Sequence, residues 1–155
     1  MLKVEAAQAV SLFLGGMIIG RWGGSRLVQR FAAPKIVLAS ILVAAAGFAL
    51  FWRAATVAMG LAGLFFCGLG TANLYPLILA IAIGVSQGNS IAASARATLA
   101  SGAAILLLPL ILGRLADTFG IRQAYWVVAI LLLGIFLIIL FAGRRAAAPA
   151  VSNEG

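Results

Sequence analysis

Long apolar runs alternate with short polar segments along the whole chain. Five such runs occur, and each is about as long as a helix that crosses a hydrocarbon core of about 30 Å. Backbone groups in lipid must be paired within their own segment, and the strict apolar–polar alternation of a membrane barrel strand is missing from these runs. The pattern therefore predicts an all-α integral membrane protein with transmembrane helices at about 6–22, 36–52, 57–84, 91–113 and 123–142.

The two ends of the chain need separate interpretation. The stretch "MLK" and the apolar run behind it have the layout of a secretory signal peptide, but Glu5 and Gln8 interrupt the run and no clear small-residue cleavage site precedes Arg21. We therefore interpret this run as a retained helix in a transmembrane domain over residues 1–143. The last residues, 144–155, read "RRAAAPAVSNEG" and are expected to form a disordered cytoplasmic tail.

Composition narrows the class of protein and the chemistry open to it. The chain is 65% hydrophobic and 9% charged, against about 45–50% and about 25% in a soluble domain, so a water-soluble protein is excluded. With no histidine, one cysteine and three acids, the usual metal, triad and carboxylate-pair sites have too few parts. We expect no enzyme activity, no cofactor, no metal and, with Cys67 alone, no disulfide.

The net charge of +8 comes from basic residues at the ends of the apolar runs, where they set topology and meet anionic lipid rather than nucleic acid. If the loop behind the first run is cytoplasmic, that side holds seven basic residues and the other side holds four. The positive-inside rule then predicts a multi-pass protein of the inner or plasma membrane with a cytoplasmic C-terminus. Five spans leave the N-terminus outside, as expected of a fragment of a larger protein. The cytoplasmic group is Arg21, Arg26, Arg30, Lys35, Arg96, Arg144 and Arg145, and the opposite group is Lys3, Arg53, Arg114 and Arg122.

Two segments rich in glycine and arginine follow the first and fourth apolar runs. They read "GMIIGRWGGSR" over residues 16–26 and "GRLADTFGIR" over residues 113–122. Three spans separate them, so they are expected on opposite membrane faces, as in transporters with inverted repeats. The glycines would allow sharp turns or close helix approach, and the arginines could bond exposed carbonyls or Asp117. The spacing of Gly16, Gly20 and Gly23 is repeated by Gly113, Asp117 and Gly120. The other candidate residues are Arg21 and Arg26 in the first segment and Arg114 and Arg122 in the second.

These segments resemble the Gly-x-x-x-Asp-x-x-Gly-x-Arg-like loop of the major facilitator superfamily (MFS). The first is similar to the loop between helices eight and nine of that family, with Gly20 where the family often has aspartate. The second, followed by "QAYWVV", resembles the segment between helices eleven and twelve. "GLGTANLYPLILAIA" resembles the tenth helix, especially in sugar-permease-like branches related to fucose permeases. The resemblance implies helices eight to twelve of a six-helix half built from inverted three-helix repeats, with an N-terminal half or partner subunit missing.

The resemblance also implies a substrate cavity near the membrane midplane, lined by the first, third and fourth spans. Asn73 could line this cavity or form an interhelical hydrogen bond, and Pro76 predicts a kink nearby. Several hydroxyls of the fourth span share one helical stripe, although such hydroxyls also bond their own backbone or allow tight packing. The cavity candidates are Gln8, Asn73, Tyr75, Ser94, Thr98 and Ser101.

Two functions fit these features. The first is transport of a small solute by alternating access, as part of an MFS carrier that is incomplete without its other half. The second is a small non-transporting membrane protein with a structural or regulatory subunit role. The acids lie outside the spans, so coupling to protons would need the missing helices, and uniport fits equally well. Aromatic residues at the span ends are interpreted as interfacial anchors: Trp22, Trp52, Tyr125 and Trp126.

Overall fold

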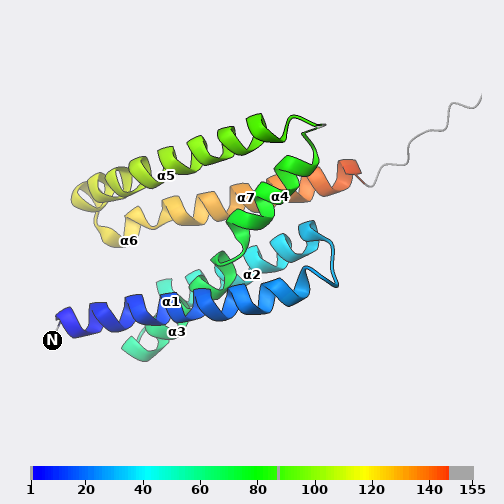
Figure 1. Ribbon diagram of the computed structural model, residues 1–155. Coiled ribbons are helices and arrows are strands. Elements are labelled where there is room, and N and C mark those ends of the chain that lie inside the picture. Colours follow the sequence, from blue (N-terminus) through cyan, green and yellow to red (C-terminus); the bar gives the residue numbers. More distant parts are fainter. Residues whose placement is uncertain (1, 87, 147–155) are drawn as a thin grey trace, which may run out of the picture.

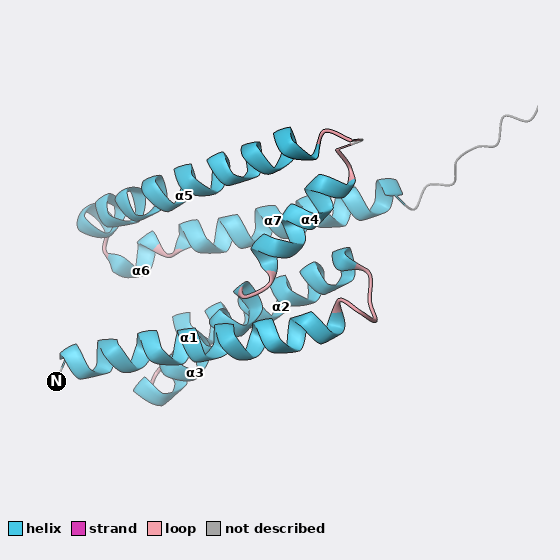
Figure 2. Cartoon of the chain, in the orientation of Figure 1, coloured by secondary structure: helices cyan, strands magenta, loops and turns pink. Residues whose placement is uncertain are grey.

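The structure is a computed structural model that describes residues 2–86 and 88–146. These residues form helices joined by short loops, with no strand among them, which confirms the all-α prediction (Figure 2). The elements in chain order are α1 (Leu2–Leu27), α2 (Ala33–Trp52), α3 (Val57–Thr71), α4 (Leu74–Gly84), α5 (Ser90–Phe119), α6 (Ile121–Ala124) and α7 (Trp126–Ala146).

Four stretches of the described residues are long and apolar enough to cross a membrane. Their mean hydropathy runs from 1.8 to 2.9, and the third predicted span is formed by α3 and α4 together. Helix α1 has 26 residues, which is ample length for a span, but it is the least apolar of the long helices. The stretches are Ala33–Trp52, Val57–Gly84, Ser90–Phe119 and Ile121–Phe141.

The long helices run back and forth between two ends of the molecule (Figure 1). One end, here called the Trp22 end, holds the α1–α2 loop (28–32), the α4–α5 loop (85–89) and the end of α7. The other, the Trp52 end, holds the α2–α3 loop (53–56) and α6. This alternation is what successive crossings of a membrane require.

Helix α3 lies between α1 and α2, and buried glycines set its distance from both. A Cβ atom added at Gly68 would collide with the carbonyl oxygen of Phe13 in α1. A Cβ atom added at Gly63 would lie 2.5 Å from the backbone nitrogen of Phe51 in α2. Because apolar side chains gain little by leaving lipid, helix association there depends on such close backbone packing. The three helices α1, α2 and α3 therefore form the most tightly packed part of the chain.

The third predicted span, 57–84, is interrupted rather than merely kinked. It divides into α3 and α4 at Ala72 and Asn73. Pro76 lies four residues after Ala72, and it lacks the N–H group that would bond the Ala72 carbonyl. The break therefore falls one turn before the proline. Beyond it, Leu77 of α4 joins a buried cluster with Val37 and Ile41 of α2.

Several helices extend further than the apolar pattern predicts. Helix α5 continues from the predicted end at residue 113 to Phe119, and the chain then turns at Gly120, whose φ is 91°. Helix α7 continues to Ala146, so residues 144–146 are helical rather than part of the expected tail. The rest of that expected tail, residues 147–155, lies outside the described residues. In α5, helical hydrogen bonding thus continues beyond the apolar stretch until Gly120 ends it.

Candidate functional site

The first glycine–arginine segment lies wholly inside α1, not in a loop. Gly16, Gly20 and Gly24 fall at four-residue intervals on the face that meets α3. A Cβ atom at Gly16 would collide with the carbonyl oxygen of Phe65, and one at Gly20 would lie 2.5 Å from that of Leu69. Here the glycines serve close helix approach, which is one of the two roles expected from the sequence.

Asn73 ties the end of α1 to the break between α3 and α4. Its Nδ2 donates a hydrogen bond of 2.6 Å to the Gly20 carbonyl oxygen, and the side chain is half-buried. The amide also packs on Gly24, where a Cβ atom would collide with it. Of the two interpretations that the sequence left open for Asn73, the structure shows the interhelical hydrogen bond. Asn73 also lines a crevice of about 260 Å³ between α1, α2 and α3.

The other members of the first segment contact less of the protein. A Cβ atom at Gly23 would meet no atom within 4 Å. The third glycine on the packed face of α1 is therefore Gly24, and not Gly23 as predicted. The repeated small-xxx-small spacing was the signal that could have identified Gly24. Arg21 is exposed, and the Arg26 guanidinium stacks over the Trp22 ring at 4.0 Å from its centre.

The second segment lies at the opposite end of the molecule, where α5 reaches α6 (Figure 1). It does not repeat the packing of the first segment, since a Cβ atom at Gly113 would meet nothing within 4 Å. Arg114, Asp117 and Arg122 are all exposed there. Among the described glycines of the two segments, Gly120 alone has a positive φ and makes a sharp turn, the other role expected of these glycines. The two segments thus share a sequence pattern and lie at opposite ends of the molecule, but their contacts differ.

Ser94 and Thr98 of the hydroxyl stripe on α5 line a shallow groove along that helix. The groove has a volume of about 730 Å³ and also includes Gly102 and Leu106. Ser94 Oγ donates to the Ile91 carbonyl oxygen at 3.0 Å, whereas Thr98 is exposed. No described residue of α5 is buried. This face of α5 therefore presents hydroxyls and apolar groups that other described helices do not cover.

The six cavity candidates do not converge on one cavity within the described chain. Asn73 contacts α1, while Ser94 and Thr98 line the groove on α5. The remaining candidates lie elsewhere: Ser101 is half-buried on α5, Gln8 is exposed on α1, and Tyr75 is 48% exposed on α4. A shared cavity would need further helices to enclose these positions.

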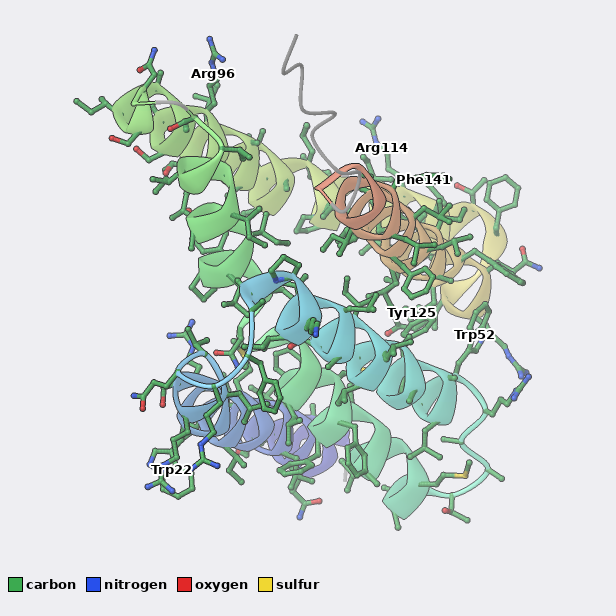
Figure 3. All side chains as sticks on the ribbon, turned by 90° about the vertical axis from the view of Figure 1, so that its right-hand side faces the viewer. Trp22, Trp52, Arg96, Arg114, Tyr125 and Phe141 are labelled. Carbon is green, nitrogen blue, oxygen red and sulfur yellow. The ribbon has the colours of Figure 1, made fainter. Side chains whose placement is uncertain are left out.

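Three of the four aromatic residues at the span ends pack on one another or on neighbouring rings. The rings of Trp52 and Trp126 meet edge-on with centres 4.7 Å apart, and Tyr125 meets Phe51 at 5.7 Å. Figure 3 shows Trp52 beside Tyr125 and Trp22 on the other side of the molecule. These rings lie at the ends of the apolar stretches, and they also join α2 to the α6–α7 segment. This second role was not predicted.

A comparison with models of protein families identifies the family of this chain. The model described as Major Facilitator Superfamily matches residues 3–155, which is nearly the whole chain. No curated protein and no solved structure matched the chain. The match agrees with the all-helical fold, the long apolar helices and the two glycine–arginine segments at opposite ends of the molecule. The chain therefore belongs to the major facilitator superfamily of membrane transporters.

Proposed function

We propose that this chain moves a small solute across the membrane by alternating access, together with a second transmembrane body. The family match over residues 3–155 carries the proposal. The exposed groove of α5 supports the need for a second body, because Ser94 and Thr98 would otherwise face lipid. An N-terminal half of the carrier or a partner subunit would cover this groove and enclose the solute.

The chemistry of the candidate positions favours a neutral polar solute. Thr98 and Ser94, which line the groove of α5, offer hydroxyl groups. These groups recognise hydroxyls by hydrogen bonding and carry no charge that would demand an ionic substrate. A sugar-like solute fits this set and agrees with the resemblance of residues 68–82 to sugar permeases.

The tight packing of α1, α2 and α3 would let these helices move as one body. Alternating access requires two bodies that rock about a central site. In this proposal Asn73 keeps α1 attached at the helix break, while the exposed charges at Arg114, Asp117 and Arg122 act at the membrane surface during the transition. Those charges are then conformational residues that do not contact the solute.

The first prediction concerns transport by the purified chain. Alone in liposomes, it should catalyse no saturable uptake of radiolabelled monosaccharides, because one body cannot enclose a solute from both sides. Liposomes that also contain the second body, expressed from DNA flanking the same gene, should show saturable uptake. Saturable uptake by the chain alone would overturn the requirement for a partner. Binding of the two bodies without any uptake of a broad solute panel would favour the structural or regulatory subunit instead.

The second prediction concerns orientation in the inner or plasma membrane. The Trp22 end carries the larger group of basic residues, so we propose that this end is cytoplasmic. An alkaline phosphatase or fluorescent protein reporter fused after Gly143 should therefore report a cytoplasmic location. The same reporter inserted at Ala54, in the α2–α3 loop, should report an external one. An exported Gly143 fusion would reverse the proposed orientation.

A further inference from the structure

A cavity of about 550 Å³ lies between α2 and α7 at the Trp52 end, away from the groove on α5. Its volume falls within the range of about 300–1,000 Å³ that is usual for sites of small molecules. Alanines on both helices, Ala45, Ala49 and Ala129, leave this space open. The space therefore results from the small side chains at these positions, and α2 and α7 form its two walls.

Helices α2 and α7 contact each other on both sides of the cavity, and these contacts fix their relative position. Toward the Trp22 end, Ile135 and Phe136 of α7 pack against the cluster that contains Ile41 of α2. Toward the Trp52 end, the rings of Trp52 and Trp126 meet edge-on. Both tryptophans also line the cavity, and Trp126 is 58% exposed. The space therefore has an apolar interior and an aromatic mouth at the end of the spans.

Two arginines complete the mouth. Arg53 directly follows α2 and Arg122 lies in α6, and both are exposed. Both line the large cavity and also an adjoining one of about 290 Å³, so they flank the same opening. The described lining of these two cavities includes no acidic side chain. The positive charge at the mouth is thus not neutralised by the residues around it.

We propose that this cavity binds an anionic phospholipid. Its phosphate would sit between Arg53 and Arg122, because guanidinium groups bind phosphate oxygens with paired, charge-assisted hydrogen bonds. Trp52 and Trp126 would flank the headgroup, where tryptophan is favoured at a membrane surface. One acyl chain would lie over the alanines of α2 and α7. A phospholipid fits better than free phosphate because the space behind the arginines is apolar.

The test uses the tryptophans of the site as reporters. The chain has three tryptophans, and Trp22→Phe leaves only Trp52 and Trp126. This variant is reconstituted in phosphatidylcholine vesicles with increasing fractions of dibrominated phosphatidylglycerol or, separately, dibrominated phosphatidylcholine. Bromine quenches tryptophan fluorescence on contact. We expect the brominated phosphatidylglycerol to reach half-maximal quenching at a fraction about tenfold lower, given two arginines at the site.

Matched charge variants identify the cause of any preference. Arg53→Gln with Arg122→Gln should remove the preference, and Arg53→Lys with Arg122→Lys should retain part of it. Arg30→Gln with Lys35→Gln removes the same charge at exposed positions of the Trp22 end and should leave the preference intact. Equal quenching by both lipids, or equal loss in the two glutamine pairs, would overturn the proposal. Displacement of the lipid by millimolar glycerol phosphate would overturn it too, because it would indicate a site for the soluble anion.

Discussion

Replacing Gly16 with alanine is expected to destabilise the folded chain, whereas the same change at the matching Gly113 is expected to be tolerated. At Gly16 the added methyl group would collide with the carbonyl oxygen of Phe65, so backbone atoms of α1 or α3 would have to move. At Gly113 the methyl group would meet no atom within 4 Å. The sequence aligns these two glycines, but the structure gives them different surroundings.

The difference in free energy of unfolding expected between Gly16→Ala and Gly113→Ala is large for a single added methyl group. Overpacking costs about 1–3 kcal/mol, and alanine in place of an uncrowded helical glycine gains about 1 kcal/mol. Both glycines are helical, so this gain applies to both variants, and their free energies of unfolding should differ by the overpacking cost of about 1–3 kcal/mol. Titration from a mild detergent into sodium dodecyl sulfate can measure this difference. Gly23→Ala serves as a second control because it lies in the first segment yet has open space. Greater sensitivity at Gly113 than at Gly16 would contradict the packing described for α1 and α3.

Asn73→Ala and Thr98→Ala are expected to affect transport in different ways. The amide of Asn73 is engaged with the Gly20 carbonyl oxygen, so its loss should weaken the attachment of α1 at the helix break. An interhelical hydrogen bond of this kind is worth about 0.6–1.7 kcal/mol, equivalent to a change of roughly three- to twentyfold in rate if it acts on the transition between states. Thr98 is exposed and lines the groove of α5. In the proposed function its hydroxyl contacts the solute.

The measurement is competition uptake by the proposed carrier, in which this chain is combined with the second transmembrane body. Asn73→Ala should lower the uptake rate while the order of competing solutes stays the same. Thr98→Ala should change that order, and Thr98→Ser, which restores the hydroxyl, should recover it. A changed order for Asn73→Ala with none for Thr98→Ala would reverse the two roles. Ala100→Ser, an exposed position of α5 outside the groove lining, controls for polarity alone.

The sequence predicted the helical spans because apolar runs of this length leave the backbone few alternatives in lipid. Helix ends are harder to predict, because a charged residue behind an apolar run suggests the start of a loop. Asp117 and Thr118 are helical because hydrogen bonding does not stop at the membrane surface, and the Thr118 hydroxyl donates back to the Arg114 carbonyl oxygen. Only Gly120, with its positive φ, marks the true end.

Contacts between distant helices were harder to predict than the spans. The hydrogen bond between Asn73 and Gly20 depends on where α1 passes the break between α3 and α4. The sequence around either residue does not show this arrangement. The same holds for the pairing of Trp52 with Trp126, whose aromatic character fitted an interfacial anchor on its own. Periodicity shows which residues share a helix face, but the partner of that face depends on the arrangement of all the helices.

The position of α3 between α1 and α2 has a consequence for the order in which the chain assembles. The contacts of Gly16, Gly20, Gly63 and Gly68 all join residues that precede α4. Once the chain as far as Asn73 has entered the bilayer, these three helices can reach their packing against one another, including the hydrogen bond of Asn73 to Gly20. Helix α5 inserts afterwards and finds its described contacts mainly with its sequence neighbours α4 and α6. During biogenesis α1, α2 and α3 can thus resist proteolysis before any other helix covers the exposed face of α5.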